Sequence, residues 1–212
     1  MVPSATSSRL DYRIITELIQ KGSRVLDLGC GNGELLAMLV EEKAAIGQGV
    51  EISEEGINAC VAKGLNVIQG DLDEGLADYA DHSFDYVVLN QTLQVVHKPD
   101  LVLKEMIRVG KQGIVGFPNF AQWAVRGQLF FKGMMPRTPE LPFEWFNTPN
   151  IHLLTIRDFE RFCREQGIQI NRKIYIKGRE SGSANFLPNL LAQTAIYVIS
   201  QVHRARGEAA DE

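Results

Sequence analysis

The chain has 212 residues, of which 45% are apolar and 23% are charged, and its formal net charge is −4. This is the composition of an ordinary globular protein, and it excludes a collagen-like, coiled-coil or disordered chain. The acidic balance disfavours a nucleic-acid partner, because such binding needs a field of Lys and Arg. The three cysteines form no CxxC pair, so we expect neither a disulfide framework nor a metal site, and a reducing compartment.

The chain shows no sign of a targeting segment. Residues 1–10 are small and polar, and no stretch reaches the ~18 apolar residues that a membrane span needs. We therefore expect a cytoplasmic protein without a membrane contact. The length predicts a single domain over 1–204, and the charged, alanine-rich residues 205–212 predict a frayed tail.

Strands and helices alternate along the first half of the chain. Helical spacing of apolar residues begins at Glu34, and Ser53 is placed to cap the start of a second helix. Apolar runs predict four strands, at 24–28, 45–50, 67–68 and 84–89. The last of these is almost continuously apolar, which is typical of a central strand covered on both faces.

The second half continues the alternation and ends on two strands. Pro99 begins a helix that Gly110 ends, and Thr155 opens another in a capping-box pattern that Gly167 ends. Further strands are predicted at 112–117, 168–176 and 195–202. Strands that alternate with helices predict an α/β fold with a doubly wound sheet.

The segment 118–150 interrupts this pattern. Residues 117–149 hold five of the eight prolines, both tryptophans and six of the ten phenylalanines. We expect a long aromatic loop that forms a lid-like insertion, because long loops in compact domains are usually functional. The alternative is an aromatic flap that covers a sheet edge.

A glycine-rich turn, DLGCGNG at 27–33, closes the first strand and opens a helix. Glycine lets a ligand approach the backbone closely. Glu34 stands where the dinucleotide fingerprint G-x-G-x-x-G requires glycine, which disfavours a pyrophosphate ligand. We expect the helix N-terminus to lower the pKa of the Cys30 thiol, although a ligand would cover it. The candidate ligand-binding residues of this turn are Asp27, Gly29, Cys30, Gly31, Asn32 and Gly33.

Further acids follow the second and third strands. Glu51 is placed to accept the hydroxyls of a ribose, and Ile52 follows it in the expected site. Asp27 favours a cationic group, whereas free N–H groups at the helix start near Gly33 favour a carboxylate. Asp71 would accept from the exocyclic amine of a base, and the main chain of Leu72 would donate to its ring. S-adenosylmethionine, or its product S-adenosylhomocysteine, carries all of these groups.

These motifs, together with the strand at 84–88, resemble the ordered motifs of class I S-adenosylmethionine-dependent methyltransferases. That resemblance implies a Rossmann-like, seven-stranded, mostly parallel sheet whose last strand is antiparallel. The segments 90–94, 116–120 and 143–152 further resemble the methionine biosynthesis protein MetW family, over nearly the whole chain. The MetW resemblance implies an accessory or regulatory partner of homoserine O-acyltransferase in methionine biosynthesis.

Catalytic residues stay unassigned, with three candidates. Asn90 ends the central strand and would hold the methyl donor or an acceptor, or would simply form a turn. His97 would act as a general base or lie in a surface loop. His152 would pack at a helix entrance or face the cleft. Gln91 and Gln94 differ from the acid, proline and aromatic residue of amine-methylating members, which disfavours nitrogen methylation.

Two other functions stay open beside the regulatory one. The aromatic insertion is compatible with an active small-molecule methyltransferase, in which orientation of donor and acceptor supplies most of the catalysis. A nicotinamide-dependent oxidoreductase is compatible with the acid after the second strand, although the glycine spacing counts against it. The sequence holds no G-x-S-x-G nucleophile elbow, so any acyl transfer belongs to a partner.

Overall fold

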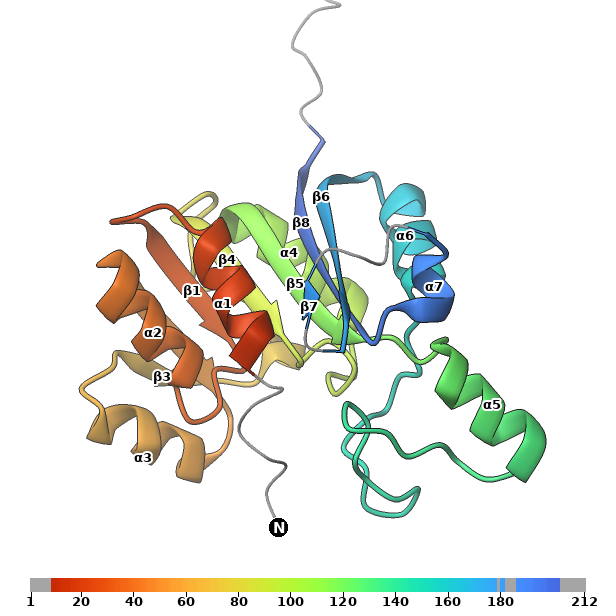
Figure 1. Cartoon of the computed structure of the whole chain (residues 1–212). Helices are drawn as coiled ribbons and strands as arrows, with labels where there is room; N and C mark the ends of the chain where they lie inside the picture. The colour runs from red at the N-terminus through yellow and green to blue at the C-terminus, as the bar shows by residue number, and fades with distance from the viewer. Residues whose placement is uncertain (1–8, 179, 182–185, 203–212) are drawn as a thin grey trace, which may run out of the picture.

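A twisted sheet organises the structure, a computed structural model that describes residues 9–178, 180–181 and 186–202 (Figure 1). The expected tail at 205–212 lies outside these residues. The strands are β1 (Arg24–Leu28), β2 (Ile46–Glu51), β3 (Val67–Gln69), β4 (Phe84–Asn90), β5 (Gly110–Pro118), β6 (Ile168–Lys177), β7 (Glu180–Ser181) and β8 (Thr194–Gln201). Their order across the described sheet is β3-β2-β1-β4-β5-β8-β6-β7.

The strand directions confirm the mostly parallel sheet expected from the sequence. β1 pairs in parallel with β2 and β4, and β4 pairs in parallel with β5. The final strand β8 runs antiparallel to both β5 and β6, as expected. The two-residue β7 adds an eighth strand to the seven predicted, since a pair of residues is too short to leave a period in the sequence.

Helices cover the sheet and begin largely where their capping residues predict. They are α1 (Arg9–Leu18), α2 (Glu34–Lys43), α3 (Glu54–Ala62), the short η1 (Leu72–Glu74), α4 (Pro99–Val109), α5 (Trp123–Lys132), α6 (Ile156–Glu165) and α7 (Pro188–Leu191). Ser53 Oγ accepts from Gly56 N at the start of α3, and Thr155 Oγ1 accepts from Asp158 N at the start of α6. These contacts confirm the predicted caps.

Alternate residues of each central strand enter different cores. Leu26 and Leu89 belong to the core that α4 and α6 cover, whereas Val25 and Val88 belong to the core that α1 and α2 cover. Because side chains alternate along a strand, Asp27 and Asn90 fall on the α1 and α2 face. The fold thereby brings two predicted site residues to the same face of neighbouring strands.

Two helices differ from the sequence-based expectations. α1 was not predicted, although Leu10, Ile14 and Leu18 recur at helical spacing. α5 shows that the expectation of a long loop over 118–150 was wrong in part. Apolar side chains occur around this whole helix, so no helical period is visible in the sequence.

The insertion leaves the sheet from an interior strand. β5 lies between β4 and β8, so the segment does not start at a sheet edge. α5 lies outside the two helix layers, beyond the end of β5 (Figure 1). Among the described helices, none is long and apolar enough to cross a membrane.

Candidate functional site

The glycine turn sits where the ends of β1, β2 and β4 meet. β1 lies between the other two strands, and all three run in the same direction. Gly29 N and Cys30 N donate to Val50 O at 2.8 and 3.1 Å, which fixes the turn against the end of β2. The crevice outside the carboxyl ends of parallel strands is where ligands bind in open α/β sheets.

The three glycines of the turn have different roles. A Cβ at Gly29 would lie 2.6 Å from Thr92 Cγ2, and one at Gly33 would lie 2.6 Å from Leu65 Cδ1. Both positions therefore need glycine for packing. Gly31 has φ +55°, and a Cβ there would meet no described atom within 4 Å. Gly31 is thus the glycine of the turn that faces open space.

Glu51 holds the turn through three backbone hydrogen bonds. Its Oε2 accepts from Gly31 N at 2.8 Å, and its Oε1 accepts from Ile52 N at 3.1 Å and from Ser53 N at 2.9 Å. The side chain is 9% exposed. A carboxylate has about four acceptor sites, so one site on Oε2 has no donor among the described residues.

Asp27 is buried behind the turn. Burial, followed by the neighbouring Glu51 carboxylate, raises the pKa of Asp27 to about 7. Removing a carboxylate from water penalises its charged form, and a second negative charge adds to the penalty. A cationic group placed here would therefore stabilise the ionised side chain.

Asp11 joins the site although the sequence-based reasoning missed it. Asn90 Nδ2 donates to Asp11 Oδ2 at 2.7 Å, while Asn90 Oδ1 is buried without a hydrogen-bond partner among the described residues. Burial raises the pKa of Asp11 above its ordinary value, against the opposing effect of the Asn90 bond. The sequence signal that could have found Asp11 is its position between Leu10 and Ile14, which lie on the apolar side of the amphipathic helix α1.

Two expectations about the turn were wrong. Burial, then the Asp27 charge and the Cys60 thiol, raises the pKa of the Cys30 thiol, whereas we expected the helix N-terminus to lower it. Gly33 N donates to Cys30 O, and Glu34 N donates to Asn32 Oδ1, so these helix-start N–H groups are not free. Burial outweighs the helix dipole in setting the pKa of Cys30, and hydrogen bonds within the turn occupy the N–H groups that we expected to be free.

The remaining predicted ligand residues line the same sheet edge farther along. Ile52 follows β2 and is 61% exposed. Asp71 caps η1 by accepting from Asp73 N at 2.9 Å, and Leu72 is buried beside it. The ends of β2 and β3 are adjacent, so these residues lie next to Glu51 along the sheet.

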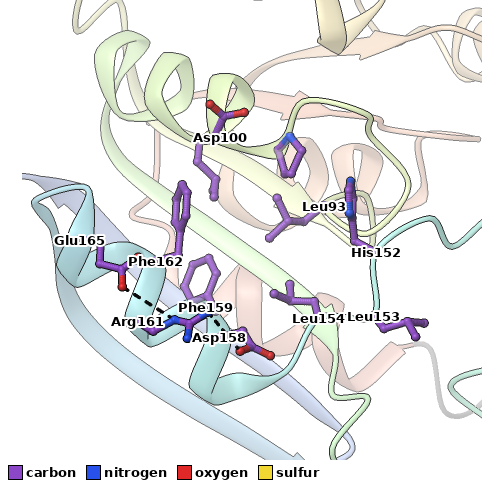
Figure 2. A pocket seen from close by; sticks show the side chains of 12 residues that line it. Leu93, Asp100, His152, Leu153, Leu154, Asp158, Phe159, Arg161, Phe162 and Glu165 are labelled. Atoms are coloured by element: carbon purple, nitrogen blue, oxygen red, sulfur yellow. Dashed lines mark ion pairs between the residues drawn. The ribbon is translucent and has the colours of Figure 1, made fainter.

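Neither histidine candidate lies at the glycine turn. His97 is exposed, and its main-chain N donates to Asp73 Oδ2 at 3.0 Å, as in the surface-loop interpretation. His152 lines a separate cavity of about 380 Å³ between α4 and α6, where it lies beside Leu93 (Figure 2). Its Nε2 is buried without a described partner. No residue of the glycine turn lines that cavity.

The family described as "Methionine biosynthesis protein MetW" matches residues 9–199. The chain belongs to the MetW family. A relative in Rhodopirellula baltica, the "Bifunctional methionine biosynthesis protein MetXA/MetW", is 38% identical over 96% of this chain. This MetW chain spans only 34% of that relative's length.

Solved structures agree on the fold of this MetW family member. An S-adenosylmethionine-dependent methyltransferase from Mesorhizobium loti covers 92% of this chain and 98% of its own, with TM-score 0.67 and 15% identity. The magnesium protoporphyrin IX methyltransferase of Synechocystis PCC 6803, solved with bound S-adenosylhomocysteine, covers 92% and 82%, with TM-score 0.63 and 16% identity. The MetW chain therefore has the class I methyltransferase fold.

Proposed function

We propose that this chain binds S-adenosylmethionine or S-adenosylhomocysteine at the glycine turn and acts as a regulatory partner of homoserine O-acyltransferase. The observation that carries the ligand assignment is the open space at Gly31, bounded by the Glu51 carboxylate and backed by Asp27. A backbone cradle between acids fits a nucleoside with a positive charge better than it fits a phosphate.

The chain's own residues divide the ligand among them. The free acceptor site of Glu51 Oε2 would take a ribose hydroxyl, and Asp71 and Leu72 would contact the base, with Ile52 covering the ring. Asp27 would face the ammonium group, and Asn90 lies beside it at the end of the neighbouring strand. Solvent-excluded carboxylates favour the cationic sulfonium over the neutral thioether, because charges interact more strongly at low dielectric.

The bifunctional relative supports the partnership. Its name joins MetXA and MetW in one polypeptide, and this chain corresponds to about a third of it. We assign the MetXA portion to homoserine O-acyltransferase. Two proteins whose counterparts are fused in one polypeptide are expected to bind each other when they are separate chains. We propose that this chain and the acyltransferase do so in methionine biosynthesis, in the cytoplasm.

Calorimetric titration tests both parts of the proposal. The chain is titrated with S-adenosylmethionine alone and again with saturating homoserine O-acyltransferase from the same organism. We expect binding in both titrations, with an affinity that differs by about 5- to 150-fold between them, the usual range for coupled sites. No binding in either titration would contradict the ligand assignment, and equal affinities would contradict the regulatory role.

Replacing Gly31 by Ala is expected to weaken S-adenosylmethionine binding at least about tenfold, since the new methyl group fills the space that the ligand needs. The matched control is Gly167→Ala, which has φ +66° and equally open surroundings at the end of α6. Both variants share the strain of a left-handed alanine, about 1–2 kcal/mol. Thermal unfolding should therefore shift alike, and a calorimetric Kd equal to wild type in Gly31→Ala would refute the placement.

An active small-molecule methyltransferase is a second candidate. Asn90 favours it, because its buried Oδ1 lacks a partner at the end of β4, next to the proposed ligand. Release of S-adenosylhomocysteine during incubation with a panel of small metabolites would support this function. If the protein binds S-adenosylmethionine but releases no S-adenosylhomocysteine with any metabolite of the panel, the result would contradict this function and favour the regulatory role.

A further inference from the structure

The insertion carries an unusual amount of exposed apolar surface. The exposed side chains of this segment are Trp123, Leu129, Phe130, Phe131, Met134, Met135, Phe143, Trp145 and Phe146. With about 150–250 Å² for each large aromatic, together they present on the order of 1,000 Å² of apolar area. These side chains lie on both sides of α5, so no single face presents the whole area. Trp123, Phe130 and Phe131 alone present about 350–550 Å², which is the size of the largest, often functional, apolar patch of a typical monomer.

Hydrogen bonds and an ion pair fix the backbone that carries these side chains. Gln128 donates from Nε2 to Arg137 O and accepts from Arg137 N through Oε1, both at 3.0 Å. Arg137 also forms an ion pair with Glu144. Asn119 Nδ2 donates to Ala192 O at 2.8 Å, which ties the base of the insertion to the end of α7. A segment whose backbone is already fixed loses little backbone entropy when a partner covers it.

The two sides of α5 differ in their surroundings. Val125 and Leu129, one turn apart, face a hollow of about 300 Å³ that Phe143 and Trp145 also line. Trp123, Gly127 and Phe131 recur at intervals of four residues, which places them together on the opposite side. Phe131 is 84% exposed. We call Trp123, Gly127, Phe130 and Phe131 the outer face of α5.

Nothing in the described part of the chain requires glycine at position 127. Its φ is not positive, and a Cβ there would meet no atom within 4 Å among the described residues. Glycine inside a helix costs about 0.5–1 kcal/mol relative to alanine. A gap between large aromatic side chains is what a second backbone needs for close approach, as when an apolar helix face enters a groove.

We propose that the outer face of α5 is the surface that docks on homoserine O-acyltransferase. This inference rests on the proposed function, and the bifunctional MetXA/MetW relative supplies the occupant. Phe130 and Phe131 are the anchors, because buried aromatics dominate interface energies. Gly127 admits the partner's backbone between them and Trp123.

The test adds bulk without removing a native contact. Gly127→Arg is expected to fold normally, to bind S-adenosylmethionine like wild type, and to lower the affinity for the acyltransferase by about 100-fold. The matched control is Val61→Arg, which places the same charge at an exposed apolar position of α3, where Val61 is 60% exposed. That variant should bind the acyltransferase like wild type.

The outcomes separate the two proposals. Wild-type affinity in Gly127→Arg would overturn the docking face and leave the partnership standing. Wild-type protein that fails to bind the acyltransferase would overturn both. Sedimentation of wild type and Gly127→Arg adds a further outcome, because a dimer that dissociates in the variant would assign this face to a second copy of the chain instead.

Discussion

Asp27→Asn should make the ligand-free protein more stable than wild type at pH 8, by about 4 kcal/mol. The pKa of this buried carboxyl rises from 3.8 to about 7 on folding. Between these values the native state keeps a proton that the unfolded chain has released. Wild-type stability therefore falls as pH increases from about 4 to 7, by about 1.4 kcal/mol for each pH unit.

Asparagine removes this titration while keeping the shape of the side chain. The difference in unfolding free energy between variant and wild type should be near zero at pH 4 and should reach its maximum above pH 7. Urea unfolding at pH 4, 6 and 8 measures it, with equal m-values as the check for two-state behaviour. The exposed carboxylate of Glu41 gives the control variant, Glu41→Gln, which should follow wild type.

If the unfolding free energies of Asp27→Asn and wild type depend on pH in the same way, folding does not raise the pKa of Asp27 and the side chain is ionised in the folded protein at neutral pH. The same variant should bind S-adenosylmethionine more weakly, because the amide offers no negative charge to the ammonium group. Gain of stability with loss of binding is typical of a site that holds strain for its ligand.

Glu51→Ala should raise the Kd for S-adenosylmethionine by about 100-fold, since each charge-assisted hydrogen bond contributes about 1.5–3 kcal/mol. The substitution removes the expected ribose acceptor. It also leaves Gly31 N, Ile52 N and Ser53 N without their acceptor, so the turn loses its fixed shape. Calorimetry measures the binding, and circular dichroism verifies that the variant folds.

Glu51→Gln sharpens the test, because both carboxylate oxygens accept from the backbone. Whichever oxygen becomes an NH₂ group meets an N–H donor, so the amide keeps part of the network only. Its Kd should fall between wild type and Glu51→Ala. The control is Glu42→Ala, at an exposed position on α2, which should bind S-adenosylmethionine like wild type. Wild-type affinity in Glu51→Ala would show that the Glu51 carboxylate does not contact the ligand.

Local signals in the sequence determined the architecture. Pro99, Thr155 and Ser53 start their helices as predicted, because capping depends on residues within one turn. The apolar run at 84–89 became a central strand, since a strand buried on both faces needs apolar residues at every position. The alternation of strands and helices predicted the doubly wound α/β sheet, and the resemblance of the glycine turn and acids to the class I motifs implied the methyltransferase fold that the structure has.

The tertiary structure decided what depends on distant contacts. Gly29, Gly31 and Gly33 are alike in sequence, and only the positions of Thr92 and Leu65 show that Gly31 alone among them faces open space. Asp11 reaches Asn90 across 79 positions of the chain, a pairing that no local period encodes.

The protonation of the site also required the fold. The sequence places Asp27 and Cys30 beside a helix start, where the dipole favours anions. Both pKa values rise instead, because folding removes the groups from water and places further negative charge nearby. Likewise, composition marked the aromatic insertion, but only the tertiary structure shows that many of its apolar side chains are exposed and do not form a buried core. Spacing along the chain determines which elements form, whereas burial and charge proximity are properties of their packing.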